Sequence, residues 1–262
     1  MEPIPSLSVV VIAKNEEANI GRCLESVAFA GEKVVVDSGS VDRTREIAES
    51  AGARVVHAPW PGDYSVQRNR GDEYAQGEWI LQIDADETIS PELAREFADF
   101  FATGKDRLNA AARMPRKEII FGKWLRHGKF CATLLRMYRK GAGAWQGRVH
   151  EHYTTDGPIH DFKNYMVHDS YVSIHVFLEK YNRYSSIDAE QDFAAGKPFR
   201  WWKLFFKPVE RFFGRYVVNG GFKDGFHGFV AAYMISLNYF LRYLKLWEME
   251  YKAKEEKRKA GR

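Results

Sequence analysis

A mostly parallel α/β fold is predicted by three features of the first 105 residues. Short apolar runs rich in β-branched residues alternate with stretches whose apolar residues have helical spacing. Capping and turn residues separate these runs, and each apolar run has the length of a single strand. Such alternation produces a parallel sheet that helices cover on both faces. Open sheets of this kind bind ligands beyond the carboxyl ends of their strands, so functional residues are expected there.

Four pairs of strand and helix are expected in this part of the chain. Strands are predicted over residues 7–12, 33–36, 54–56 and 78–83. Helices are predicted over residues 16–27, from Ser40 or Asp42 to Ala51, and over residues 65–75. Gly52 suits the position that ends the second helix. Ser90 and Pro91 suit the cap and the first position of a fourth helix.

The pattern changes after residue 110. Short strand-like pieces are predicted over residues 110–114, 119–121, 134–138 and 144–149, and they extend the same domain. From Ser173 onward the spacing is helical again. We therefore predict one α/β domain over residues 1–172 and an aromatic, basic helical extension over residues 173–262.

The composition is that of a folded protein, with 45% hydrophobic and 28% charged residues among 262. These values exclude a disordered chain and a polytopic membrane protein. Cys23 and Cys131 lie in apolar segments without metal-site spacing, so both are predicted to be reduced, buried thiols of a cytoplasmic protein. Residues 1–6 do not have the pattern of a secretory signal.

The charge is unevenly distributed along the chain. Residues 196–262 contain 15 Lys and Arg against 6 Asp and Glu, whereas residues 1–195 contain 24 against 29. The same final segment contains 17 of the 38 aromatic residues. An anionic membrane surface attracts this composition; a nucleic acid would attract the charge, but no nucleic-acid-binding motif accompanies it.

Two stretches of the extension suggest peripheral attachment to a membrane. Residues 226–241 carry no charge, but they are fewer than the ~20 apolar residues that a spanning helix needs. Residues 199–213 interleave Trp and Phe with Lys and Arg, as interfacial helices do. The alternative is that these aromatic side chains pack on the α/β domain or on another subunit.

The clearest chemical signal is the acidic segment Asp84-Ala85-Asp86. It directly follows the predicted strand 78–83, and two carboxylates at positions i and i+2 there can face one hard cation. Mg²⁺ and Mn²⁺ are held by a few carboxylates together with substrate phosphates. The alternative is a solvated acidic turn, which Glu87 continues.

Two further polar segments follow neighbouring strands. Asp37-Ser38-Gly39-Ser40 comes after the second strand, and Asn15-Glu16 comes after the first. Parallel packing would bring them to the same sheet edge as Asp84 and Asp86. The alternative is that they serve as helix caps.

Four segments in this order resemble the family 2 glycosyltransferases of GT-A fold, a Rossmann-like, mostly parallel sheet flanked by helices. The segments are residues 9–17 (VVVIAKNEE), 36–44 (VDSGSVDRT), 67–71 (QRNRG) and 84–87 (DADE). The similarity covers about the first 170 residues, and the ordered set is far more specific than any one segment. It implies a metal-dependent, inverting enzyme that uses a UDP-sugar.

The resemblance also implies roles for individual residues. Glu16 and Asp37 would contact the uridine, Arg68 the diphosphate, and Asp86 a Mn²⁺ or Mg²⁺ ion, with Asp84 near the ribose or a metal-bound water. The implied nucleotide-sugar site comprises Ala13, Asn15, Glu16, Asp37, Ser38, Ser40, Arg68, Asp84 and Ala85. The donor would bind to about residues 1–105 and the acceptor to about residues 106–172.

Glu151 is the predicted catalytic base. In a single displacement the acceptor hydroxyl must lose its proton, and a carboxylate within hydrogen-bond reach can take it. No acid is needed, because a divalent cation stabilises the departing diphosphate. The alternative is a surface role beside His150 and His152, and Asp156 and Asp161 are competing candidates.

Other predictions concern the metal and the acceptor. His168 is a candidate metal ligand, as a later His is in some relatives; alternatively it is a structural, hydrogen-bonded side chain. A basic stretch suits an anionic acceptor, although it could be a solvated loop. The candidate acceptor residues are Trp124, Arg126, His127 and His150, with Lys129 nearby.

Residues 145–151 (WQGRVHE) and the extension resemble, more narrowly, the lipopolysaccharide core β-glucosyltransferases. This implies transfer of glucose from UDP-glucose to a lipid-linked saccharide at the inner face of a bacterial inner membrane. Transfer to a polyprenyl phosphate is an alternative within the fold, and a non-catalytic, sugar-nucleotide-binding or membrane-attached scaffold is an alternative of another class. The helical extension also offers a surface for homo-oligomers.

Overall fold

The computed structural model describes residues 2–148, 151–171 and 173–260. The chain divides into two compact units. The first unit is formed by Met1–Lys117 and Ala132–Ser170, and the second by Glu118–Cys131 and Tyr171–Arg262. Residues 118–131 thus belong with the C-terminal segment, although the linear pattern placed them in the α/β domain. The functional division into a catalytic domain and an extension stays a prediction.

The first unit is built on one mixed sheet with the strand order β3-β2-β1-β4-β8-β6-β12-β5. Its first four strands are parallel to one another, and β8 runs antiparallel to β4. The strands on this path are β1 (Ile4–Ala13), β2 (Ala30–Asp37), β3 (Arg54–His57), β4 (Trp79–Asp84), β5 (Glu87–Ile89), β6 (Ala111–Ile120), β8 (Ala132–Arg139) and β12 (Met166–Tyr171).

Four short strands complete the sheets. β11 (Ile159–Asp161) pairs with β6, and β9 (Ala144–Gln146) pairs with β10 (His152–Thr154) in a separate hairpin. In the second unit, β7 (Lys123–Leu125) pairs with the last residues of β6. The observed mostly parallel α/β sheet confirms the predicted fold class.

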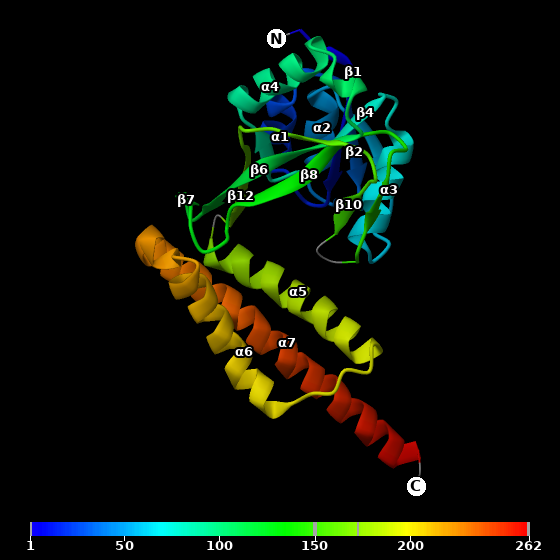
Figure 1. Cartoon of the computed structure of the whole chain (residues 1–262). Helices are drawn as coiled ribbons and strands as arrows, with labels where there is room; N and C mark the ends of the chain where they lie inside the picture. The colour runs from blue at the N-terminus through cyan, green and yellow to red at the C-terminus, as the bar shows by residue number, and fades with distance from the viewer. Residues whose placement is uncertain (1, 149–150, 172, 261–262) are drawn as a thin grey trace. The chain divides into compact units, whose positions relative to one another are not determined.

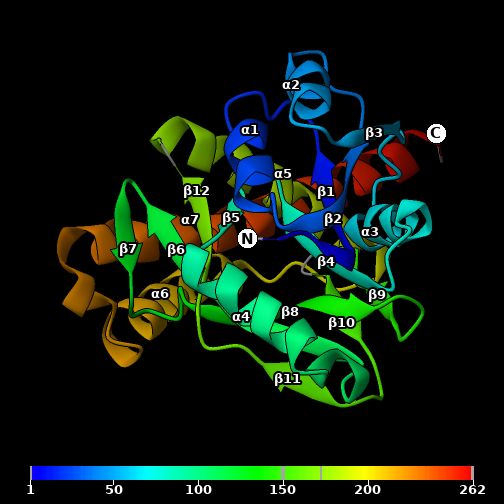
Figure 2. The same ribbon diagram turned by 90° about the horizontal axis from the view of Figure 1, so that it is seen from above.

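Helices cover both faces of the sheet because the side chains of each buried strand alternate between them. Val9 and Val11 of β1 join a core cluster that includes residues of α1 (Ile20–Ser26), α2 (Thr44–Ser50) and α4 (Pro91–Ala102). Val10 joins a cluster on the other face, with residues of α3 (Tyr64–Tyr74), β9 and β10. Helices α1 and α2 lie side by side (Figure 2).

Helix ends mostly follow the predicted signals. The Ser90 side chain accepts a hydrogen bond from the Leu93 amide, and Pro91 is the first residue of α4. Gly52 follows α2 with a positive φ of 73°. However, α2 begins only at Thr44, whose amide donates to the Asp42 carboxylate, and α1 begins at Ile20 instead of residue 16. The first residues of these two predicted helices lie instead in the loops that precede α1 and α2.

The second unit contains three long helices, α5 (Ile174–Ala194), α6 (Trp201–Phe213) and α7 (Gly225–Ala260). A π-helical turn (Gly214–Val218) and a 3-10 turn (Gly221–Asp224) connect the last two. α7 packs along both α5 and α6 (Figure 1), and Arg242 of α7 pairs with Asp188 and Asp192 of α5. No helix in the described ranges has an apolar stretch long enough to cross a bilayer.

The prediction of two buried cysteines was wrong for one of them. Both thiols are free, and Cys23 is buried in α1 as expected. Cys131 is exposed, because it lies in the turn just before β8 and not within the strand.

Candidate active site

The carboxyl ends of three parallel strands bring the predicted acidic residues to one edge of the sheet. Residue pairing aligns Ala13 at the end of β1 with Asp37 of β2, and Ile12 with Asp84 of β4. Asp37 and Asp84 therefore lie on either side of β1. This convergence follows from the parallel register, as the sequence suggested.

Hydrogen bonds join the loops that follow β1 and β2. The Asn15 amide donates to Ser40 Oγ at 2.9 Å, and Asn15 Oδ1 accepts from the Val41 amide at 2.9 Å. The Glu16 amide donates to Thr44 Oγ1 at 2.7 Å. Asn15 has a φ of 56°, a left-handed conformation that Asn tolerates better than most residues. The two loops thus form one braced edge.

Asp37 is fully buried at the base of this edge. Its carboxylate accepts hydrogen bonds from the Ser40 amide at 3.0 Å and the Gly39 amide at 3.3 Å. Gly39 has a φ of 97°, a conformation that glycine adopts without strain. Two side chains that sequence reasoning did not select, His57 of β3 and Arg45 of α2, place a nitrogen 3.6 Å and 3.9 Å, respectively, from Asp37 Oδ2.

The smaller predicted site residues lie at the same strand ends as these carboxylates. The Ser38 amide donates to the Ala13 carbonyl at 2.9 Å, and Ser38 Oγ accepts from Gln67 Nε2 at 3.0 Å. Ala85 is buried directly after β4. α3 approaches the sheet closely at Gly71, where a Cβ atom would lie 2.7 Å from Val10. That approach places the side chains of α3 against the site.

Arg68 of α3 is the centre of a buried charge network. Its guanidinium donates to Asp84 Oδ1 at 2.5 Å, to Glu151 Oε1 at 2.8 Å and to Gln82 Oε1 at 3.3 Å. Its Cζ lies 4.7 Å from the centre of the Trp145 ring. The side chain of Arg68 is only 1% exposed. Although burial acts to lower the pKa of Arg68, the charges of Asp84 and Glu151 raise it above its ordinary value, so the group stays charged.

A second buried arginine, Arg136 of β8, closes the network. Its Nη2 lies 3.2 Å from Asp84 Oδ2 and 3.8 Å from Glu87 Oε1. Glu87 is also 3.2 Å from Arg116 and accepts from the Asp84 amide at 2.8 Å. Burial acts to raise the pKa of Asp84, but the charges of Arg68 and Arg136 outweigh it and hold that pKa well below its usual range. Asp84 is therefore ionised.

Asp86 and His168 form a second, smaller group. His168 Nε2 lies 3.4 Å from Asp86 Oδ1, and β12 carries His168 beside β5 in register with Glu87. Two ligands of one octahedral cation, each at about 2.1 Å, lie about 3.0 Å apart, so this spacing fits a shared Mn²⁺ or Mg²⁺. The described ranges contain no group of three or more His, Cys, Asp or Glu side chains placed to hold a metal. A cation here would need phosphate or water as additional ligands.

The predicted base, Glu151, is held by Arg68, whereas its competitors lie elsewhere in the first unit. Asp161 of β11 pairs with Arg113, and Asp156 is exposed in a turn. Only Glu151 among these three joins the network around Asp84.

The candidate acceptor residues belong to the second unit, apart from His150, which lies outside the described residues. The Arg126 and His127 amides donate to Asp224 Oδ2, and His127 Nδ1 lies 3.2 Å from Asp224 Oδ1. The Arg126 guanidinium stacks over the Trp124 ring at 4.2 Å. These contacts order the loop within its own unit, and its acceptor role stays a prediction.

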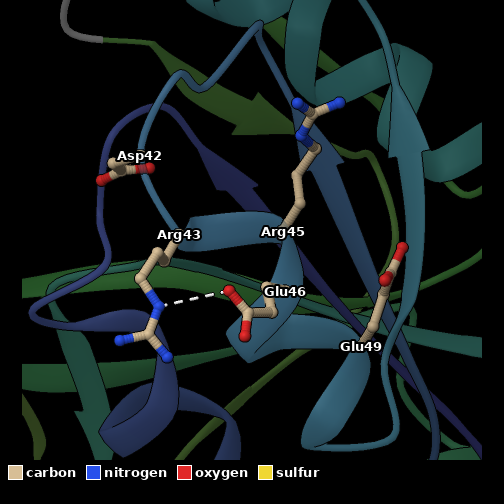
Figure 3. Close-up of a pocket in the computed structure, with 5 residues that line it drawn as sticks. All are labelled: Asp42, Arg43, Arg45, Glu46 and Glu49. Atoms are coloured by element: carbon tan, nitrogen blue, oxygen red, sulfur yellow. Dashed lines mark hydrogen bonds and ion pairs between the residues drawn. The ribbon is translucent and has the colours of Figure 1, made fainter.

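A pocket of ≈ 360 Å³ lies on the outer surface of α2 (Figure 3). Five charged side chains line it, and two of them, Arg43 and Glu46, pair with each other. Arg45 points away from this pair in Figure 3. No apolar group is available to hold a base or sugar ring, so we do not assign the donor to this pocket.

Sequence reasoning missed Arg136 and underrated Glu87. A signal for Arg136 was present, because it is a charged residue inside the otherwise apolar strand-like run 134–138. Charged residues are buried only when paired, so its position indicated a buried partner. Nothing local identified that partner as Asp84.

A known protein family matches the part of the chain that contains these residues. The model of "Glycosyl transferase family 2" matches residues 8–159, which include the converging strand ends. The chain belongs to glycosyl transferase family 2. It is thus a glycosyltransferase, and the first unit has the GT-A fold that the resemblance implied.

Two full-length relatives support the family 2 assignment. The lipopolysaccharide core biosynthesis glycosyltransferase LpsC of Rhizobium meliloti (strain 1021) is 31% identical over 95% of this chain and 94% of its own length. A glycosyltransferase of Rickettsia typhi, RT0209, is 31% identical over 95% of this chain and 89% of its own.

Solved structures of two other proteins are more distantly similar. Glucosyl-3-phosphoglycerate synthase from Mycobacterium tuberculosis, solved with Mn²⁺, UDP and glucosyl-3-phosphoglycerate, is 27% identical with a TM-score of 0.36. That match covers 42% of this chain and 43% of the synthase. Staphylococcus aureus TarS 1–349 is 17% identical, with a TM-score of 0.49, over 96% of this chain and 92% of its own.

Proposed function

We propose that this family 2 glycosyltransferase transfers glucose from UDP-glucose to a hydroxyl group of a lipid-linked saccharide such as the lipopolysaccharide inner core. The observation that carries the proposal is the network in which Arg68 joins Asp84 and Glu151 at the carboxyl ends of the parallel strands. The choice of acceptor is supported by the similarity to LpsC over almost the whole chain.

The donor diphosphate would bind at the edge formed by the loops after β1, β2 and β4. Asp86 and His168 would hold Mn²⁺ or Mg²⁺, since their facing atoms have the spacing of two ligands of one cation. When bound, the cation stabilises the negative charge that develops on the departing diphosphate. Asn15, Glu16, Asp37, Ser38 and Ser40 would position the nucleoside.

Glu151 would take the proton of the acceptor hydroxyl as that oxygen attacks the anomeric carbon. Its ion pair with Arg68 fixes the position of the carboxylate, which is what general-base catalysis requires. One displacement at that carbon inverts its configuration. Because Arg68 is buried beneath both carboxylates, we propose that it orients Asp84 and Glu151, and a contact with the diphosphate would require these bonds to rearrange.

The test is release of UDP from UDP-glucose in the presence of a deacylated, water-soluble core saccharide. We expect turnover to require Mn²⁺ or Mg²⁺, to stop with a chelator, and to fall about 10²- to 10³-fold in Asp86→Ala. Asp156→Asn is the matched control, because that exposed carboxylate of the same unit is outside the network. Full activity of Asp86→Ala, or full activity after chelation, would remove the metal from the proposal.

We further propose that the reaction takes place at the cytoplasmic face of the bacterial inner membrane. The nature of the acceptor and the basic, aromatic composition of residues 196–262 support this location. Fractionation of cells into cytosol and washed membranes tests it directly; recovery of the protein entirely in the cytosol would contradict it.

A further inference from the structure

Helix α6 exposes an unusual amount of aromatic surface. Six of its thirteen residues are Trp or Phe, yet none of its residues is buried. Trp201 is 68% exposed and Phe206 is 66% exposed. Soluble surfaces rarely expose contiguous apolar patches of this kind without a partner.

The apolar and charged residues of α6 lie on different sides of the helix. At 100° per residue the apolar side chains occupy an arc of about 200°, and the charged residues fill much of the remainder. One edge of the apolar arc packs against α7, where Phe212 contacts Phe229 at a centroid distance of 5.5 Å. The rest of the arc is exposed, and its members are Trp201, Trp202, Phe205, Phe206, Val209 and Phe213.

The exposed surface continues through the turns into the beginning of α7, which runs beside α6 (Figures 1 and 2). The ring centroid of Tyr216 lies 6.4 Å from that of Phe222 and 5.7 Å from that of Phe229. The rings of Phe226 and Phe229 are stacked, with their centroids 6.1 Å apart. Val218, Phe222 and Phe226 are all exposed. We call this combined surface of α6, the two turns and the start of α7 the aromatic face.

Positive charge accompanies the aromatic face. Residues 196–233 contain seven Lys and Arg but only two Asp and Glu. Glu210 pairs with Lys207 at 2.6 Å, and Asp224 is buried against the His127 loop. Lys203 Nζ lies 6.0 Å from the centre of the Tyr243 ring, and Arg211 Cζ lies 4.7 Å from the centre of the Tyr239 ring, both rings belonging to α7. The net field at this face is therefore positive.

We propose that the aromatic face docks on an anionic lipid bilayer, with the Trp and Phe side chains inserted at the interface and the Lys and Arg side chains at the headgroups. Aromatic rings favour this depth, and anionic headgroups attract the cations. A second copy of this chain is a poorer partner, because pairing two such faces would bring like charges together. The inference deepens the proposed function, on which it depends for its biological purpose but not for the binding itself.

The experiment measures cosedimentation of the full chain with two kinds of vesicle. One consists of phosphatidylcholine alone, and the other of equal amounts of phosphatidylcholine and phosphatidylglycerol. The unmodified protein should bind the anionic vesicles, and added salt should weaken binding. The double variant Phe205→Ser/Phe206→Ser should bind about tenfold more weakly or worse. Lys203→Gln/Lys207→Gln should lose the preference for anionic vesicles.

The matched control is Trp247→Ser/Tyr251→Ser, which removes two exposed aromatic residues of α7 outside the aromatic face. This variant should bind vesicles like the unmodified protein, and thermal melting should show that all variants are folded. Equal vesicle binding by Phe205→Ser/Phe206→Ser and the unmodified protein would overturn the proposal. A second result would also overturn the proposal: the unmodified protein does not bind vesicles, and light scattering shows a dimer that Phe205→Ser/Phe206→Ser dissociates. The aromatic face would then be a protein interface.

Transfer to the water-soluble acceptor, without vesicles, separates this inference from the proposed function. The Phe205→Ser/Phe206→Ser variant should keep that activity while losing vesicle binding. If the unmodified protein binds vesicles but transfers no sugar, the proposed function fails and the docking surface stands.

Discussion

The two units depart from the usual distribution of residues in opposite ways. In the first unit, Arg68, Glu87 and Arg136 are charged side chains in the interior, where charge is costly unless it is paired. In the second unit, Trp and Phe side chains of α6 are exposed to solvent, although such residues normally contribute to cores. The first departure lies at the ends of the parallel strands, and the second lies on a helix with no buried side chain.

These departures indicate function more clearly than the shape of the surface does. The pocket on α2 is hollow but consists of solvated charges that compensate one another. By contrast, the network around Asp84 is maintained at a cost in desolvation that a hydrophobic core would avoid. A protein retains such a cluster when the charges themselves have a use, and the same reasoning applies to an apolar surface left in water.

The largest expected effect is the loss of catalytic rate in Glu151→Gln. Removing the base should lower the rate of transfer to a hydroxyl acceptor by about 10²- to 10⁴-fold, with unchanged UDP binding in calorimetry. Asp156→Asn serves again as control. Full activity of Glu151→Gln with the hydroxyl acceptor would show that Glu151 is not the base. Turnover with a polyprenyl phosphate that Glu151→Gln leaves unchanged would instead favour that acceptor, which is already ionised and needs no base.

Arg68→Met tests whether the buried charges depend on one another. The variant leaves Asp84 and Glu151 without their shared cation, so we expect the free energy of unfolding to fall by about 3–5 kcal/mol. Urea denaturation measures this loss. Arg70, two residues later on the same helix, is half-buried and donates one hydrogen bond to the Pro59 carbonyl, so Arg70→Met should cost about 1 kcal/mol or less. Equal effects of the two substitutions would mean that the network contributes nothing specific.

A smaller effect concerns the pH dependence of stability through Asp72. Burial raises the pKa of Asp72 to about 6, against the hydrogen bonds from Tyr138 and Gln82 and the charges of Arg68 and Lys140, which act to lower it. Folding therefore favours the protonated form, and this stabilisation is lost as the pH rises through about 6.

Comparison with Asp72→Asn isolates this contribution. The stability of the unmodified protein relative to the variant should fall between pH 5 and pH 7.5 by on the order of 1 kcal/mol. Denaturation of both proteins at both pH values gives the difference, and the substitution keeps an oxygen acceptor for Tyr138. A difference that does not change with pH would show that Asp72 is not the responsible group.

The smallest expected effect is that of Phe205→Ala in the second unit, and Phe97→Ala in the first unit is its comparison. Phe205→Ala should change the free energy of unfolding by about 0.5 kcal/mol or less, because the side chain is 58% exposed. Phe97→Ala, which empties a fully buried position of α4, should cost about 3–5 kcal/mol. Thermal and chemical denaturation compare the two. A large loss in Phe205→Ala would indicate that α6 is covered in solution.

Much of the first unit was predictable because its signals are local. The β-branched runs of β1, β2 and β4, the cap at Ser90 and the glycine at position 52 each act within a few residues. Helix starts were less predictable, since residues 15–17 and 40–44 have capping character but form hydrogen bonds with each other across two loops. Cys131 was predicted to be buried because its neighbours in the sequence are apolar. That pattern does not specify where a strand begins, and Cys131 lies just outside β8.

The sequence by itself determined the family, the alternating fold and the placement of Asp37, Asp84 and Asp86 at strand ends, because strand periodicity and parallel pairing follow from residues close in the chain. Only the tertiary structure decided that Arg68 binds Glu151, 83 positions away, that Arg136 also holds Asp84, and that residues 118–131 join the helical unit. The exposure of α6 was decided there as well. Each of these depends on which surfaces meet when distant segments pack, and hydrophobic periodicity specifies that a face is apolar without specifying what covers it.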